Sequence, residues 1–336
     1  MRLLKKKETQ NTGITNLKRF SGQAIQKALA FVTLIVMIIF FSVASPNFFV
    51  PDNIISILLA TCVNGLLALG VTFVIITGGI DLSIGTVMTF SAVIAGVSVT
   101  VWGLPLWLGV LIALATGSII GCLTGLMVAY LRIPAFIATL GVMMVTKGLS
   151  LVVSGASPVY FPTGYKEIAV GSLISKLIPG FRLQNGVLIF FVMALIAGVI
   201  LNRTVLGRYT FAIGSNAEAT RLSGVNVNRW LTAIHTLSGL FCGIAGVVIS
   251  SRLGSAQPAL GQGYELEAIA AVVIGGTSLS GGQGTISGTV IGAFIMSVLT
   301  NGLRIMGVKQ EWQTVVIGLV VILAVFIDIY RRKKQK

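Results

Sequence analysis

Few residues of this chain could do chemistry, and those that could lie inside or beside long apolar runs. Three carboxylates lie there, Asp81, Glu265 and Glu267, together with the single histidine, His235. A carboxylate in the first turn of a helix is stabilised by the helix dipole, and we favour that interpretation for the acids. We assign His235 a packing role. No Ser/His/Asp set, metal cluster or pair of intramembrane carboxylates can be assembled around it, so we expect no enzymatic activity.

The rival interpretation places polar residues of the apolar runs at a gate or along a transport pathway. Ionisable groups inside a membrane are costly and for that reason often functional. The candidates for such a pathway are Asn64, Asp81, Tyr264, Glu265 and Glu267.

Residues Leu279–Gln283 spell Leu-Ser-Gly-Gly-Gln, the signature peptide of ATP-binding-cassette ATPases. A nucleotide site also needs the phosphate-binding loop G-x-x-x-x-G-K-[ST], which this chain does not contain. The peptide lies between apolar runs and not in a soluble α/β context. We therefore interpret it as a coincidence and expect this chain to bind no cofactor.

The composition indicates an integral membrane protein. Of 336 residues, 55% are hydrophobic and only 10% are charged, with a mean hydropathy of +0.97. The 40 glycines fit this class, because glycine lets membrane helices approach closely. Three cysteines, Cys62, Cys122 and Cys242, fall inside apolar runs without metal-ligand spacing, which favours a packing role.

A membrane-spanning helix needs about 20 apolar residues. Counting such runs predicts an all-α membrane protein with about ten transmembrane helices and a transmembrane domain over 28–330. The predicted spans are 28–45, 54–77, 83–102, 106–130, 134–153, 186–202, 231–252, 264–280, 285–305 and 312–330.

The distribution of the +15 formal net charge predicts the orientation of these spans. Basic residues gather in the N-terminal segment 1–27, the insert 203–230 and the tail 331–336, and Arg132 adds one more. With ten spans, 17 of the 24 basic residues face the cytoplasm, in agreement with the positive-inside rule. This count favours an even number of spans and does not separate ten from eight. Both termini are then cytoplasmic, and 154–185 is the longest outer segment. We expect no nucleic-acid binding, because no basic surface is interleaved with aromatic residues. The outer segment is either a small structured cap, where a soluble partner could dock, or a plain connecting loop.

Glycine patterns predict how the spans pack. Residues 71–88 and 271–288 share one plan, in which apolar stretches flank a Gly/Ser-rich centre, and this favours two related halves with broken helices around a pathway. Glycines four apart are typical of close helix contacts. They occur in three sets: Gly117, Gly121 and Gly125; Gly284, Gly288 and Gly292; and Gly239 with Gly243.

The insert 203–230 is polar and basic, so it must project from a membrane face. Its middle predicts a short helix, with an N-cap at Ser215 or Asn216, Glu218 in the first turn and Gly224 as the stop.

The chain resembles the ribose-type permeases of bacterial ATP-binding-cassette (ABC) sugar importers, in order, from about residue 30 to its end. The motifs that carry the resemblance are 45–49 (SPNFF), 78–85 (GGIDLSIG), 134–140 (PAFIATL), 206–209 (LGRY), 214–228 (GSNAEATRLSGVNVN), 255–258 (SAQP), 263–279 (GYELEAIAAVVIGGTSL) and 322–325 (ILAV). The match is specific for the permease family and much less so for the sugar.

This resemblance implies a multi-pass protein of the bacterial inner membrane that forms the pathway for a monosaccharide, ribose first. It implies three partners besides membrane lipid: a cytoplasmic ATPase that uses ATP, a periplasmic or lipid-anchored sugar-binding protein, and a second permease copy or a paralogue. It also implies that the loop between the sixth and seventh spans holds a coupling helix that docks in the ATPase. The residues carried over to that helix are Ser215, Asn216, Ala217, Glu218, Ala219, Arg221, Leu222 and Gly224.

Two other classes stay open. A self-powered secondary transporter or facilitator would need intramembrane acids for ion coupling, and Asp81, Glu265 and Glu267 are the candidates. A membrane-embedded enzyme is disfavoured by the missing catalytic constellation.

Overall fold

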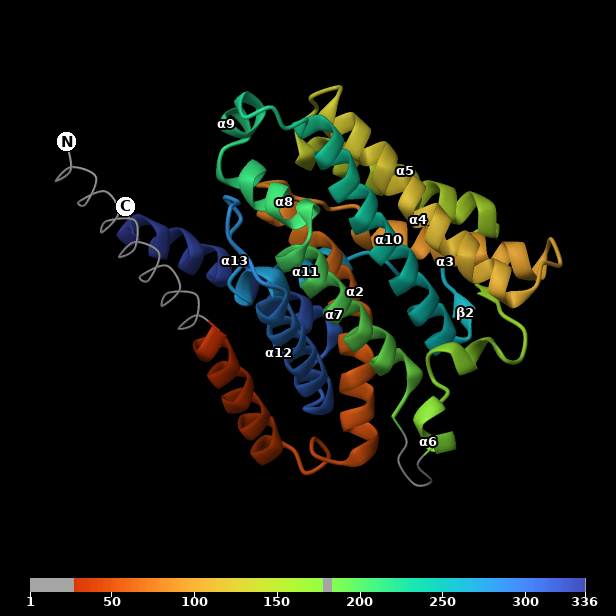
Figure 1. The fold of residues 1–336 in the computed structure, drawn as a ribbon. Helices are drawn as coiled ribbons and strands as arrows, with labels where there is room; N and C mark the ends of the chain where they lie inside the picture. The colour runs from red at the N-terminus through yellow and green to blue at the C-terminus, as the bar shows by residue number, and fades with distance from the viewer. Residues whose placement is uncertain (1–26, 178–182, 336) are drawn as a thin grey trace, which may run out of the picture.

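A computed structural model describes residues 27–177 and 183–335, with side chains up to Tyr330, and it forms a bundle of helices (Figure 1). The predicted segment 1–27 therefore lies almost wholly outside the described residues. In the described part, eight helices are long and apolar enough to cross a membrane, which confirms the all-helical membrane class. They are Lys27–Ala44, α2 (Pro51–Ile76), α4 (Leu106–Ala129), α5 (Ala135–Ser154), α7 (Asn185–Arg203), α10 (Val227–Leu253), α12 (Ile286–Ile305) and α13 (Gln310–Gln335).

Two of the ten predicted spans are shorter than expected. Helix α3 (Ile84–Thr100) has 17 residues, and α11 (Tyr264–Ile274) has only 11. At about 1.5 Å per residue α11 is roughly 16 Å long, about half of the hydrocarbon thickness. The prediction of a continuous span over 264–280 is wrong in extent. The helix ends where Gly275 and Gly276 follow, the latter with a φ of +93° that side-chain-bearing residues rarely adopt.

Helices α2 and α10 are the most buried long helices of the described part, and α10 packs against α2 and against α4. Glycines make the α4–α10 contact possible, because a Cβ on Gly121 would overlap the carbonyl oxygen of His235 and a Cβ on Gly117 would overlap that of Gly239. His235 itself is buried here, and its Nδ1 lies 3.0 Å from the carbonyl oxygen of Leu231. The packing role predicted for the glycines and for His235 agrees with this geometry.

Replacing Gly239 with alanine is expected to lower the stability of the chain by about 1–3 kcal/mol, because the added Cβ forces α4 and α10 apart. Thermal unfolding of the purified protein measures the effect. Gly148→Ala is the control, since a Cβ on that residue of α5 meets no atom within 4 Å. Equal melting temperatures for the two variants would contradict this packing account.

A second glycine contact joins α11 to α12. A Cβ on Gly288 would overlap the carbonyl oxygen of Gly275, and one on Gly292 would overlap that of Ala271. The prediction that Gly284 shares this helix face is wrong, because α12 begins only at Ile286.

The two stretches that suggested an internal repeat both form helix–loop–helix units. Their loops, 77–83 and 275–285, lie close together, and the carbonyl oxygen of Ser280 is 3.9 Å from the position of a Cβ on Gly78. The first helices of the two units differ in length: α2 has 26 residues and α11 has 11.

The described parts of the predicted outer segment, 154–177 and 183–185, are folded against the bundle. Strand β1 (Val159–Tyr160) pairs antiparallel with β2 (Ser255–Ala256), directly after α10, and the 3-10 helix η1 (Tyr165–Ile168) and α6 (Leu173–Leu177) follow. Tyr165 stacks on Phe161 with ring centroids 3.7 Å apart, and its hydroxyl lies 3.0 Å from Ser250 Oγ. Burial raises the pKa of Tyr165 to about 12, so the phenol stays neutral. A structured cap describes this segment better than a plain loop.

Candidate functional site

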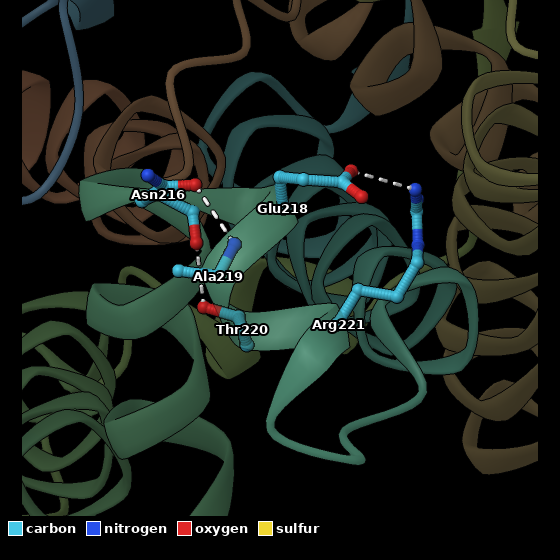
Figure 2. A network of polar contacts seen from close by, with 5 residues as sticks. All are labelled: Asn216, Glu218, Ala219, Thr220 and Arg221. Atoms are coloured by element: carbon cyan, nitrogen blue, oxygen red, sulfur yellow. Dashed lines mark hydrogen bonds and ion pairs between the residues drawn. The ribbon is translucent and has the colours of Figure 1, made fainter.

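The insert between α7 and α10 forms two short helices, α8 (Val205–Ser215) and α9 (Ala217–Leu222). Of the two N-cap candidates, Asn216 is the cap of α9. Its Oδ1 accepts a hydrogen bond of 2.9 Å from Ala219 N, and its carbonyl oxygen accepts one of 2.8 Å from Thr220 Oγ1 (Figure 2). Gly224 follows the helix with a φ of +84°, as the predicted stop requires. Local sequence therefore accounts for where this helix begins and where it ends.

The side chains of α9 face outward. Only Thr220 is buried, while Leu222 is 82% exposed. Glu218 and Arg221 form an ion pair of 3.2 Å on this surface (Figure 2). An exposed pair contributes at most about 1 kcal/mol to folding, so stability does not account for it. Leu222 is exposed on the same surface, so both charged and apolar side chains of α9 are accessible from outside the bundle. Helix α9 lies at the opposite end of the molecule from α6 (Figure 1).

A polar cavity of about 590 Å³ lies between α2, α10, α11, α12 and α13. Three of the five pathway candidates meet there: Asn64, Tyr264 and Glu267. The closest contact is a hydrogen bond of 2.6 Å that Asn64 Nδ2 donates to Glu267 Oε2. This bond joins the middle of α2 to the first turn of α11, over 203 residues of sequence. Glu267 thus does more than stabilise the start of its own helix.

Two arginines of the cavity were missed by the sequence analysis. Arg252 lies in the last turn of α10, and Arg304 lies in the last turn of α12. A basic residue in that place is ordinarily explained by the helix dipole, so neither position attracted notice. Gln262 and Gln313 also line the cavity. Two guanidinium groups, a carboxylate and several amides offer many hydrogen-bond donors and acceptors to a polar solute.

The other two candidates lie elsewhere and stabilise helix ends. Asp81 Oδ1 accepts hydrogen bonds from Ser83 N (2.9 Å) and Ser83 Oγ (2.6 Å), immediately before α3. Glu265 accepts from the backbone N of Gly263 at 3.1 Å, at the start of α11. Glu265 lies in the first turn of α11, as the favoured interpretation requires, whereas Asp81 precedes the first turn of α3. Glu267 also lies in the first turn of α11 but has a partner on another helix.

The ends of the lining helices show how the cavity is oriented. The last turns of α10 and α12, the first turn of α11 and the first turn of α13 all surround it. Helix α10 begins just after the insert that carries α9, so the cavity lies toward the end of α10 that is farther from α9. It extends inward to Asn64, near the middle of α2.

Comparison with known proteins places the whole chain. The family described as "Branched-chain amino acid transport system / permease component" matches residues 53–325. The chain is 41% identical to the ribose import permease protein RbsC of Escherichia coli (strain K12), covering 96% of this chain and 98% of the relative. It is 41% identical to RbsC of Bacillus subtilis (strain 168), covering 94% and 95%, and 38% identical to the fructose import permease protein FrcC of Rhizobium meliloti, covering 91% and 86%.

No solved structure matches the chain. The family match covers far more than half of the sequence, and the relatives align from end to end. The resemblance found from the motifs is thereby confirmed, and the chain belongs to this family of transport-system permease components.

Proposed function

We propose that this chain is the membrane-spanning permease subunit of an ABC importer, and that it forms the pathway for ribose or a related monosaccharide. The observation that carries the proposal is the polar cavity that reaches Asn64 and Glu267 in the middle of the bundle. Its donors and acceptors suit a hydroxyl-rich solute. Relatives named as ribose and fructose import permeases support the sugar class.

Helix α9 is the proposed coupling helix. Its surface, from Ser215 to Gly224, docks into a cytoplasmic ATPase that consumes ATP, with Glu218 and Arg221 as polar contacts and Ala219 and Leu222 as apolar ones. The accessibility of these side chains supports this assignment, as does the motif 214–228, which resembles the coupling loop of the permease family. A sugar-binding protein delivers the sugar to the outer side, where the folded segment 154–185 lies, and a second permease copy or a paralogue completes the pathway.

The proposed topology has ten passes through the bacterial inner membrane with both termini in the cytoplasm. Helix α3 supplies one pass at about 26 Å. Helix α11 and the loop 275–285 together supply another, which carries the chain from the outer side to the start of α12. Ten passes place the coupling helix and the segment 154–185 on opposite sides.

Single cysteines at Asn216 and Lys166 test this topology. In a background without Cys62, Cys122 and Cys242, an impermeant thiol reagent added to intact cells should label the cysteine at 166 and not the one at 216, because both positions are exposed and lie on opposite sides. After lysis both should react. Labelling of both from outside would refute the ten-pass topology.

The alternative function is a self-powered secondary transporter, and Glu267 is the observation that favours it, since a carboxylate inside the membrane can couple to an ion. Proteoliposomes separate the two functions. Uptake of labelled ribose that needs the ATPase, the binding protein and ATP supports the importer. Uptake by the chain alone under a proton or sodium gradient would establish the secondary transporter. Labelled fructose, galactose and xylose in the same assay identify the preferred sugar.

A further inference from the structure

The loop between α11 and α12, which contains the Leu-Ser-Gly-Gly-Gln peptide, lies directly against the ends of two other helices. Gly282 N donates a hydrogen bond of 2.8 Å to the carbonyl oxygen of Ile76, the last residue of α2. A Cβ on Gly282 would lie 2.9 Å from Ser215 Oγ, at the end of α8. A Cβ on Gly281 would lie 2.8 Å from the carbonyl oxygen of Gly214 and 3.0 Å from Gly78 N. The backbones of residues 76–78, 214–215 and 281–282 therefore touch, and we call this contact the three-segment junction.

The three-segment junction has no space for a side chain at Gly214. A Cβ on Gly214 would overlap the carbonyl oxygen of Ile76 and lie 2.7 Å from Gly282 N. These are the two groups that form the hydrogen bond between α2 and the loop. The end of α8 thus lies over this bond without an intervening side chain. Packed backbones at this distance cannot slide past one another freely, so a shift of one segment displaces the others.

Each side of the three-segment junction leads to one part of the candidate site. The residue after Ser215 is Asn216, which caps α9. The loop continues in the other direction into α11, whose first turn carries Glu267. Helix α11 has 11 residues, about three turns, so the loop and Glu267 lie at its two ends. A second tie fixes the loop, because Ser278 Oγ donates to Asp328 Oδ2 of α13 at 3.1 Å.

We propose that the three-segment junction transmits movement of α9 through α8 to the loop and α11, and so to the Asn64–Glu267 contact in the cavity, with Gly214 as the positioning residue. The inference rests on the proposed function, in which the docked ATPase supplies the force that moves α9. It gives the Leu-Ser-Gly-Gly-Gln peptide a mechanical role in place of a nucleotide site. Small shifts at one site become larger rearrangements when packed elements have discrete arrangements.

The test uses the full chain in lipid nanodiscs without its partners. A single cysteine at Thr300, which lines the cavity, reports on the cavity through its rate of reaction with a water-soluble maleimide, in a background without Cys62, Cys122 and Cys242. Gly214→Ala should change this rate at least about threefold, because the added Cβ displaces the loop and α11. Gly198→Ala is the matched control, since a Cβ on that residue of α7 meets no atom within 4 Å, and it should leave the rate unchanged.

A rate for Gly214→Ala equal to that of the parent would overturn the proposal. Thermal unfolding shows whether the variant is folded. If it is not, Ser278→Ala decides the question, because it removes only the hydroxyl that ties the loop to α13. A twofold or greater change in the labelling rate of Ser278→Ala supports the proposal, and an unchanged rate refutes it.

Uptake assays separate this inference from the proposed function. The labelling experiment needs neither ATP nor sugar, so it stands if the chain proves to be a secondary transporter. With the ATPase and the binding protein present, the ATPase should hydrolyse ATP within about twofold of the parent rate in complex with Gly214→Ala, and this complex should import at least about tenfold less sugar. Parallel loss of hydrolysis and import would refute the transmission role, whereas absence of ATP-driven import by the parent chain would refute only the proposed function.

Discussion

Replacement of Glu218 by lysine is expected to reduce ATP-driven sugar uptake at least about tenfold while the chain stays folded. The change places two positive side chains three residues apart on α9, where Glu218 and Arg221 now form an ion pair. Loss of an exposed pair costs the fold at most about 1 kcal/mol, but reversed charge in a docking surface costs several times as much. Co-purification of the ATPase with the permease measures the docking, and uptake in proteoliposomes measures transport.

Two further variants serve as controls for that result. Glu311→Lys makes the same change at an exposed acid in the first turn of α13 and should leave ATPase association unchanged. The double variant Glu218→Arg with Arg221→Glu restores an ion pair in the opposite direction. Association that stays low in the double variant shows that the ATPase contacts these charges. Parent-level association for Glu218→Lys itself would remove the coupling role from α9.

A second large effect is expected in the cavity, where Glu267→Leu should lower the uptake rate about tenfold or more. The leucine leaves Asn64 Nδ2 without its acceptor, and it removes the carboxylate that lines the cavity with Arg252 and Arg304. Each unsatisfied buried polar group costs about 1–3 kcal/mol. This corresponds to roughly a fivefold to 150-fold change in the equilibrium constant of any step in which that group is buried. Initial rates of labelled ribose uptake, at equal protein levels in the membrane, provide the measurement.

Glu267→Gln and Glu265→Gln are the matched controls. The first keeps a side-chain oxygen that can accept from Asn64, so it should retain more uptake than Glu267→Leu. The second changes the neighbouring acid, whose partner is the backbone of Gly263, and should cost less than either. Equal uptake by the parent and Glu267→Leu would show that the sugar does not pass this contact.

Sequence patterns were sufficient for the long helices because the membrane determines their length. The runs 106–130 and 186–202, for example, became helices with ends within about one residue of the prediction. The end of α11 was not predictable in the same way. Glycine occurs throughout the spans of this chain, so the Gly-Gly pair at 275–276 does not by itself predict a helix end. The end coincides with the positive φ of Gly276 and with a close backbone contact between Gly275 and Gly288 of α12, and neither can be read from the sequence.

The candidate site also has one part that local sequence predicts and one part that depends on tertiary packing. Helix α9 was predictable to its cap, because N-capping depends on residues three apart in sequence. The cavity was only partly predictable. Asn64, Tyr264 and Glu267 attracted notice as polar residues in or beside apolar runs, but no pattern indicated that Arg252 and Arg304 would join them. These residues converge from four helices, and their meeting depends on packing that sequence spacing does not encode.

Helix α10 connects the two ends of the molecule as one rod. Its 27 residues span about 40 Å, and it follows the insert that carries α9. Its far end carries Arg252 beside strand β2, which pairs with β1. A rod that pivots at its middle moves its ends in opposite directions. A tilt of about 5° would carry each end about 1.7 Å, given the half-length of about 20 Å. Such a tilt would narrow one side of the bundle and widen the other, and the close glycine contacts between α4 and α10 would carry α4 along with it.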